Sequence, residues 1–481
     1  SLDGSNGFVI EDRTLLSPQS PGLTSIGDVN GDGLSDVAVS SGTGRTHIVS
    51  GRSTILDSRL HLSAIDGENG VLVELTLAGA AGDFNGDGFD DLIFQQDGTV
   101  AVVAGRSEFR SEDFEGDTLR SATLKTIAYQ QNVPRVAGSQ GDVNGDGFDD
   151  VVFASEFDDV GSLRTAGRVF VVFGEATQSD ESLSLSMLDG RNGFQIESDF
   201  GGRRLGRSAE LVGDFNGDGF DDLLMTGVPV NDLVTQTSDG AYVLFGKAGG
   251  FEATISLASL TGTDGLHIQR RSVNFSSSND RIYTARPAGD VNADGFDDIF
   301  LMLVISNFSG PLANDQMVVL YGQAEFDQPL RIESQVDDQR GFEFSPGSFS
   351  DDVRSNSGNG ADFNGDGFAD LLFGAPGRDL GGLTDAGVVY VVLGGDIVGE
   401  HAGEIIGENV AQFGTGIGEQ LVANQGPNKR DVLVGSQGND TLISDGGPDV
   451  LNGGVGDDRL VIADAGFQRV TGGGGFDELV L

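Results

Sequence analysis

Residues 82–94 read GDFNGDGFDDLIF and join a short acidic loop to the apolar run that follows it. The nine-residue loop recurs six times along the chain, at intervals of 55, 59, 72, 76 and 72 residues. Each copy precedes an apolar run such as VVFA or LLM. A second apolar run, ending in glycine, comes later, as in VFVVFG. The loops begin at Asp28, Asp83, Asp142, Asp214, Asp290 and Asp362.

Each repeat unit predicts about four short β-strands separated by Gly, Asn and Asp turns. No stretch has a 3.6-residue apolar period long enough for a crossover helix, although residues 107–130 are ambiguous. Four strands in a unit of this length are typical of a propeller blade, whose apolar faces stack on neighbouring blades. We therefore predict an all-β fold with a β-propeller of six evident blades over residues 1–400. A linear β-solenoid is the alternative, although its repeats are usually shorter.

A nine-residue period replaces the longer repeat near the C-terminus. Aspartates recur in one register of this period and leucines in another, at Asp431, Asp440, Asp449 and Asp458 and at Leu433, Leu442, Leu451 and Leu460. This spacing predicts a short parallel β-roll over residues 426–481, with a glycine-rich loop as the alternative. Residues 401–425 fit neither pattern, and a linker or a degenerate seventh blade are both open for them.

The acidic loops have the donor chemistry of a calcium site. Calcium prefers six to eight oxygen ligands in flexible geometry. Asp83, Asn85, Asp87 and Asp91 supply side-chain oxygens at positions 1, 3, 5 and 9, and the carbonyl of Phe89 supplies position 7. Position 12 is apolar in every copy, which excludes an EF-hand, because that motif needs a glutamate there. A single copy could be a plain Asp-Asn-Gly turn, but six copies with the same ligand positions argue against that reading.

The other five loops place the same residue types at the same positions. Position 8 is Ser35 in the first loop and Ala369 in the sixth, so we interpret the acidic residue elsewhere at this position as solvated surface. The predicted ligands in these loops are Asp28, Asn30, Asp32, Leu34 and Asp36; Asp142, Asn144, Asp146, Phe148 and Asp150; Asp214, Asn216, Asp218, Phe220 and Asp222; Asp290, Asn292, Asp294, Phe296 and Asp298; and Asp362, Asn364, Asp366, Phe368 and Asp370.

Both repeats resemble known calcium-binding families. The pattern GDFNGDGFDDLL, followed by a Val-rich strand ending in FG, resembles the FG-GAP repeats of the integrin α-subunit propeller over residues 1 to about 398. That resemblance implies a propeller, usually of seven blades, with Ca²⁺ in loops at one rim. The C-terminal nonapeptides resemble the RTX repeats of proteins exported by type I secretion. This second resemblance implies that Asp440, Asp449 and Asp458 lie beside Ca²⁺ and that the leucines point inside the roll.

Composition limits the class of partner. The 75 acidic and 28 basic residues give a net charge of −47, which argues against nucleic acid or an anionic membrane and favours cations. Cysteine is absent, which excludes disulfides and thiol chemistry. No apolar run reaches 18 residues, so we expect no transmembrane segment. The first residues lack the basic and apolar segments of a signal peptide, and we expect a mature piece or a fragment.

No catalytic motif stands out among the four histidines, His47, His61, His267 and His401. His267 lies in a predicted strand, where a structural role is expected. We therefore expect a non-enzymatic, calcium-stabilised extracellular or cell-surface module that acts in adhesion or structure. Its partners besides calcium would be other proteins or surface glycans. The alternative is a propeller enzyme, or the accessory domain of an enzyme, acting on polysaccharide or phospholipid.

Overall fold

The structure is a computed structural model, and every regular element among its described residues is a β-strand or a short 3-10 helix. The chain divides into two compact units: residues 1–286 with 301–306 and 323–335, and residues 287–300 with 307–322 and 336–481. No described helix is long and apolar enough to cross a membrane. The described residues are 9–11, 22–41, 44–51, 59–65, 69–96, 99–114, 123–129, 135–139, 141–176, 182–227, 240–260, 262–269, 281–292, 294–304, 316–326, 330–332, 340–344, 354–355, 368–375, 388–392, 394, 411–413, 420–422, 432–434, 439–444, 450–452, 458–462, 469–471 and 478–480.

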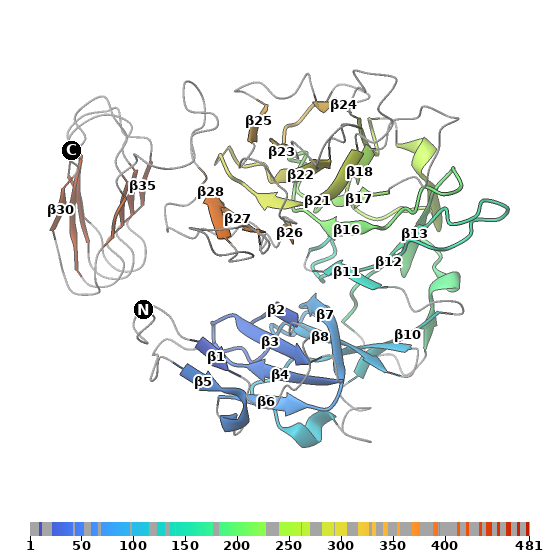
Figure 1. The fold of residues 1–481 in the computed structure, drawn as a ribbon, viewed down its shortest axis with the longest axis horizontal. Helices are drawn as coiled ribbons and strands as arrows, with labels where there is room; N and C mark the ends of the chain where they lie inside the picture. The colour runs from blue at the N-terminus through green and yellow to red at the C-terminus, as the bar shows by residue number, and fades with distance from the viewer. Residues whose placement is uncertain are drawn as a thin grey trace, which may run out of the picture. The chain divides into compact units, whose positions relative to one another are not determined.

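Five consecutive sheets have the up-and-down order of propeller blades (Figure 1). In each, four antiparallel strands pair side by side in the order in which they occur along the chain, although in four of the sheets a strand of another sheet lies between the third and the fourth; three of the sheets add a short fifth strand. The sheets are β2 (Gly22–Gly27), β3 (Asp36–Ser41), β4 (Arg45–Val49) and β6 (Gly70–Val73); β7 (Thr76–Gly82), β8 (Asp91–Gln96), β9 (Thr99–Val103), β10 (Thr123–Ala128) and β14 (Leu183–Ser184); β11 (Arg135–Ser139), β12 (Val151–Ser155), β13 (Arg168–Val172), β15 (Gly193–Glu197) and β19 (Thr254–Ser256); β16 (Ser208–Leu211), β17 (Leu223–Thr226), β18 (Gly240–Leu244), β20 (Gly265–Gln269) and β24 (Leu330–Arg331); and β21 (Arg281–Gly289), β22 (Asp298–Val304), β23 (Gln316–Leu320) and β25 (Gly341–Phe344).

The remaining strands of the repeat region form two smaller sheets. A three-stranded antiparallel sheet contains β26 (Arg354–Ser355), β27 (Leu371–Ala375) and β28 (Val388–Val392). A parallel pair contains β1 (Val9–Glu11) and β5 (Arg59–His61). Four 3-10 helices, η1 (Leu62–Ala64), η2 (Ser111–Phe114), η3 (Leu185–Met187) and η4 (Leu257–Ser259), complete the regular elements. The ambiguous residues 107–130 thus contain η2 and β10.

Apolar residues on both faces of the strands pack one blade on the next. In β12, Val151 and Phe153 belong to a core shared with the second blade, while Val152 and Ala154 belong to a core shared with the fourth. Because side chains alternate across a strand, both faces are buried only if a sheet lies on each side. This explains why the strand sequence VVFA is a continuous apolar run rather than an alternating one, and it confirms the predicted blade stacking.

The C-terminal residues form two four-stranded parallel sheets, as predicted for a β-roll. One contains β29 (Ala411–Phe413), β31 (Val432–Val434), β33 (Val450–Asn452) and β35 (Arg469–Thr471); the other contains β30 (Gln420–Val422), β32 (Thr441–Ile443), β34 (Arg459–Val461) and β36 (Glu478–Val480). Successive strands alternate between the sheets, so each leucine of the nine-residue register enters one common core. These leucines, Leu433, Leu442, Leu451 and Leu460, are buried.

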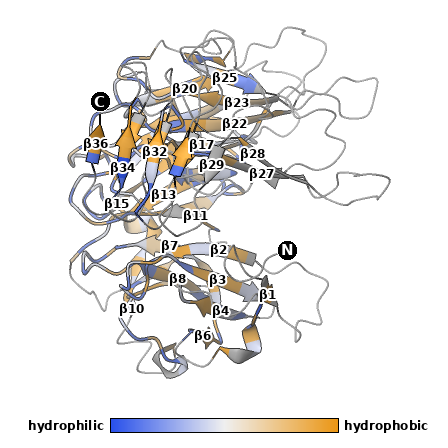
Figure 2. Cartoon of the chain, turned by 90° about the vertical axis from the view of Figure 1, so that its left-hand side faces the viewer, coloured by the Kyte–Doolittle hydropathy of each residue, from blue (hydrophilic) through white to orange (hydrophobic). Residues whose placement is uncertain are grey.

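The roll begins before the nine-residue aspartate period does. Strands β29 and β30 lie within residues 401–425, for which the sequence left a linker or a degenerate blade open, and they pair in parallel with β31 and β32. Leu421 packs against the core of leucines. Figure 2 shows the apolar character of the roll strands. This first turn of the roll contains strands but lacks the aspartates that recur every nine residues. The nine-residue period therefore does not predict it.

Candidate metal loops

The acidic loops connect the first and second strands of the blades. In the first five loops, where position 1 is described, that residue organises the loop, because its carboxylate accepts backbone N–H groups from later loop residues. In the third loop, Asp142 Oδ1 accepts from Gly145 N at 2.6 Å and Asp146 N at 3.1 Å, and its Oδ2 accepts from Gly147 N at 2.7 Å. The glycine at position 6 has φ of +88°, a left-handed conformation that glycine adopts without strain. The chain therefore curls around the first carboxylate.

Positions 3 and 5 turn their oxygens into the same loop. Asn144 Oδ1 accepts from Asp146 N at 2.8 Å, and Asp146 Oδ1 accepts from Phe148 N at 3.1 Å. The first, second, fourth and fifth loops repeat both contacts. The structure thus brings together the side chains predicted at positions 1, 3 and 5 in five loops. The same positions of the sixth loop, Asp362, Asn364 and Asp366, lie outside the described residues.

Position 9 has a different environment from the other predicted ligands. Asp150 is fully buried; its Oδ2 accepts from Val143 N at 2.9 Å and its Oδ1 from Gly174 N at 3.0 Å. Gly174 is the glycine that ends the second apolar run of the repeat. Burial, together with the repulsion of nearby loop carboxylates, raises the pKa of the ninth aspartate to about 8 in the second loop (Asp91) and in the fourth (Asp222). The corresponding aspartates, Asp36, Asp91, Asp222, Asp298 and Asp370, also accept from their strand-ending glycines.

The recurrent glycine of that contact leaves no room for a side chain, in addition to donating the hydrogen bond. A Cβ on Gly174 would lie 2.5 Å from the carbonyl oxygen of Asp149, and a Cβ on Gly246 would lie 2.5 Å from that of Asp221. The sequence signal was the recurrent glycine at the end of each second apolar run. Its role was not identified because its partner is 24 residues away.

The interpretation of position 8 as solvated surface is wrong. Asp149 Oδ2 accepts from Asp83 N of the preceding loop at 2.7 Å, and burial raises the pKa of Asp149. Asp90 and Asp221 make the same contact with Asp28 N and Asp142 N. The partner belongs to another repeat, so a single loop sequence gives no sign of it.

We call the contact between two successive acidic loops a loop junction. At the junction of the second and third loops, two backbone hydrogen bonds accompany the carboxylate of Asp149. Asp149 N donates to Asp83 O at 3.2 Å, and Glu175 N donates to Phe84 O at 3.0 Å. Equivalent bonds join the first loop to the second and the third to the fourth. In the sixth loop, position 8 is Ala369, which has no carboxylate. Its backbone still makes the first of these bonds, because Ala369 N donates to Asp290 O at 3.0 Å. The first four acidic loops are therefore fastened directly to one another in chain order, and the sixth is fastened to the fifth.

A phenylalanine also crosses each junction among the first four loops. A Cβ on Gly86, at position 4 of the second loop, would lie 2.6 Å from the ring of Phe148 in the third loop. Gly86 has φ of +73°. Gly31 and Gly145 meet Phe89 and Phe220 in the same way. Position 7 is thus aromatic because its ring covers the neighbouring loop.

The roll aspartates occupy buried positions between successive turns. Asp440 and Asp458 are almost fully buried, and Asp440 N donates to Asp458 Oδ1 at 2.7 Å. Arg459 N donates to Asp440 O and Glu478 N to Asp458 O, both at 2.8 Å. Asp449 lies outside the described residues. A carboxylate buried beside backbone groups of the next turn is suited to hold a cation between turns.

The donor set of the loops fits calcium. Within the described residues, no three acidic or histidine side chains are already grouped as a metal site. Two carboxylates and one amide oxygen nevertheless converge on one curled loop, and all the available side-chain donors are oxygens, as calcium prefers. Ligation by position 9 and by the carbonyl of position 7 stays a prediction.

Comparison with protein families agrees with this geometry. Residues 207–244 and 355–392 match the FG-GAP repeat. Residues 428–460 match the RTX calcium-binding nonapeptide repeat in four copies. No curated protein matches the chain significantly. The FG-GAP match at residues 207–244 contains β16 to β18 and the fourth acidic loop. The RTX match at residues 428–460 extends from β31 into β34.

Proposed function

Because the chain carries FG-GAP repeats followed by RTX repeats, which bind Ca²⁺ as a structural ion, we propose that it is a calcium-stabilised extracellular adhesion module. The loop junctions carry this proposal. Acidic loops of neighbouring blades share hydrogen bonds, so a cation bound in one loop acts on the contact between two blades. Calcium would then stiffen the whole blade stack and not only isolated turns.

Electrostatics supports a requirement for calcium. Several carboxylates lie within each loop, and the chain as a whole carries a net charge of −47. Repulsion between close carboxylates destabilises the compact state, and a bound divalent ion reduces it. Extracellular modules bind calcium with dissociation constants of roughly 0.1–1 mM, so such loops fill outside a cell and empty inside it.

Export by type I secretion to the extracellular space or cell surface belongs to the same proposal. RTX repeats are typical of extracellular proteins secreted by that route. A chain whose roll and blades are completed by calcium would stay loosely folded in the cytosol and fold after export.

The propeller has six blades in this proposal. The five complete sheets and the three described strands of the sixth support that number. Besides calcium, the partners would be other proteins or surface glycans.

The alternative function is a propeller enzyme or an enzyme's accessory domain acting on polysaccharide or phospholipid. One observation favours it: Arg203 donates to the hydroxyl of Tyr242, and the Tyr242 ring stacks on His267. Convergent Arg, Tyr and His side chains are found in catalytic as well as binding sites. Incubating the calcium-loaded protein with polysaccharides and phospholipids, and measuring product release, separates the two classes.

Surface retention tests the adhesion proposal. Labelled protein is applied in 2 mM calcium or in excess chelator to surfaces coated with glycans or matrix proteins, with heat-unfolded protein as the control. We expect calcium-dependent retention on at least one coating and no product release. Equal retention with and without calcium would contradict a calcium-stabilised adhesion module, and turnover of a substrate would favour the enzyme.

A further inference from the structure

Two loops meet at the end of the third and fourth blades that is remote from the acidic loops. Residues 156–167 follow the far end of β12, and residues 198–207 lead into the far end of β16. The loops are paired by backbone bonds: Gly202 N donates to Arg164 O at 2.7 Å, and Arg204 N donates to Thr165 O at 3.1 Å. Leu205 N donates to Ala166 O at 2.9 Å. The two loops therefore form one unit.

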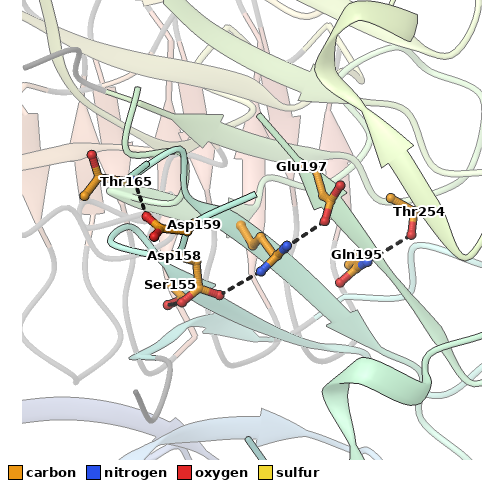
Figure 3. Close-up of polar contacts among 8 residues, drawn as sticks. Ser155, Asp158, Asp159, Thr165, Gln195, Glu197 and Thr254 are labelled. Atoms are coloured by element: carbon orange, nitrogen blue, oxygen red, sulfur yellow. Dashed lines mark hydrogen bonds and ion pairs between the residues drawn. The ribbon is translucent and has the colours of Figure 1, made fainter. Parts of the chain in front are cut away.

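A polar network beneath the loops fixes their position (Figure 3). The guanidinium of Arg168 donates to two carboxylates, from Nη1 to Asp158 Oδ2 at 3.4 Å and from Nε to Glu197 Oε1 at 2.8 Å. The fully buried Asp158 also accepts from Ser155 Oγ at 2.7 Å. Figure 3 also shows Asp159 beside Thr165, whose N–H it accepts at 2.7 Å. Such buried, satisfied networks make loop geometry rigid.

The backbone of this unit is strained at two neighbouring residues. Thr165 has φ of +46° and Arg204 has φ of +51°, and no other non-glycine residue in the described part of the chain has a positive φ. The left-handed region costs non-glycine residues free energy, most of all a β-branched threonine. Strain of this kind clusters at binding and active sites, where the surrounding structure holds a side chain in one place. Here it holds the Arg204 side chain.

Both arginines of this loop lie against aromatic rings. The guanidinium carbon of Arg204 is 4.9 Å from the ring centroid of Phe157, and that of Arg203 is 4.8 Å from Phe200. The rings are exposed, at 53% for Phe157 and 43% for Phe200. The buried Nε of Arg204 has no hydrogen-bond partner among the described residues. Exposed rings beside two arginine guanidinium groups indicate a surface that binds a ligand.

A second aromatic pair continues the cluster inward. Arg203 Nη1 donates to the Tyr242 hydroxyl, and the Tyr242 ring stacks on His267 with centroids 4.4 Å apart. His267 Nδ1 contacts Gln269 Nε2 at 2.8 Å, while its buried Nε2 has no partner within the described residues. Gly240 leaves room for this ring, because a Cβ there would lie 2.5 Å from His267 Nε2. The cluster thus ends in a further unused polar atom.

We propose that this rim cluster, formed by Phe157, Phe200, Arg203, Arg204, Tyr242 and His267, binds a carboxylate-bearing saccharide such as a uronic acid oligomer. The guanidinium groups suit a carboxylate, because their planar N–H groups match its two oxygens. The exposed rings suit the apolar face of a sugar ring. The inference deepens the proposed adhesion function and rests on it, and it names the site and the ligand class.

Calorimetric titration with a galacturonic acid tetramer tests the assignment, with 2 mM calcium present throughout. A neutral galactose tetramer and a tetraglutamate peptide are the comparison ligands. We expect saturable binding of the acidic sugar and much weaker binding of the other two. Equal binding of tetraglutamate would overturn the saccharide assignment in favour of an acidic peptide, and absence of binding to the acidic sugar would overturn the site.

Variants locate the binding. Arg204→Gly keeps the positive φ that glycine tolerates and removes the guanidinium, so the fold is retained and the dissociation constant for the acidic sugar rises about 10-fold to 100-fold. Phe200→Ala removes an exposed ring and also weakens binding. Met187→Ala, at an exposed apolar residue on η3, is the matched control and leaves binding unchanged.

An unchanged dissociation constant in both Arg204→Gly and Phe200→Ala would overturn the proposal, because the sugar would then be held elsewhere, for example by calcium at the acidic loops. The failure of the site and the failure of the adhesion function are distinguishable. Calcium-dependent surface retention without binding of the acidic sugar rejects only this site, whereas loss of retention itself rejects the adhesion function.

Discussion

At the scale of single residues, the ninth aspartate of the second loop differs from that of the third, where both oxygens of Asp150 accept backbone N–H groups. Asp91 is buried and accepts from Gly105 N at 2.8 Å, so it fastens the loop to the end of a distant strand. Its other oxygen, Oδ2, accepts no hydrogen bond from the described residues. One oxygen therefore holds the loop, and the other is available to a cation.

Asp91→Asn separates these roles, because an amide keeps the acceptor for Gly105 and removes the charge. In excess chelator we expect the variant to be at least as stable as the parent, since a buried carboxylate is replaced by a neutral group. In calcium we expect it to bind one ion fewer. Thermal unfolding and metal analysis measure the two effects. Unchanged calcium content would demote Asp91 to a purely structural residue.

His267 gives a pH prediction with a definite sign. Burial, and then the charge of Arg203, lower its pKa from 6.5 to about 4. Between these values the unfolded chain binds a proton that the folded chain does not, so the free energy of unfolding falls as the pH falls from 6.5 to 4. The slope from this group is about 1.4 kcal/mol per pH unit. His267→Gln should lose that part of the slope in denaturant titrations; an identical slope would contradict burial of a neutral histidine.

At the scale of elements, the loop junction explains residues that the motif alone does not. The acidic pattern at positions 1, 3 and 5 could be predicted, because those residues interact within one loop. Positions 4, 7 and 8 could not, because Gly86, Phe148 and Asp149 meet across two repeats. The first turn of the roll was missed for a related reason: β29 and β30 keep the strand pairing but lack the aspartate register.

Two glycines of one loop provide a matched test of the junction. Gly86 and Gly88 both have positive φ, but only Gly86 faces the ring of Phe148, whereas a Cβ on Gly88 meets no atom within 4 Å. Alanine at Gly88 should cost about 1–2 kcal/mol from backbone strain alone. Alanine at Gly86 should cost more, because the neighbouring blade must also move. Chemical denaturation in chelator compares them, and equal losses would argue against the junction.

At the scale of the whole molecule, the two repeat types should respond differently to calcium. The blades bury Val, Ile, Leu and Phe on both faces of each sheet, whereas the roll core consists mainly of one leucine per turn. A structure with less apolar burial depends more on its ions.

Excess chelator should therefore unfold residues 426–481 first and leave the propeller looser but partly folded. Limited proteolysis followed by mass spectrometry across a calcium titration locates the cleavage sites, and circular dichroism follows the loss of strand structure. Protease resistance of the roll in chelator would contradict this order. Cleavage confined to the blades would do so as well.

The most direct test of the central claim is the calcium content of the chain after dialysis against calcium buffer. Each of the six acidic loops is expected to hold one ion, which gives about six in the propeller, and the roll should add a few more. Elemental analysis alongside protein concentration gives the ratio. A ratio of about six or more supports calcium as the ion that completes the loops, whereas fewer than three ions per chain would contradict it.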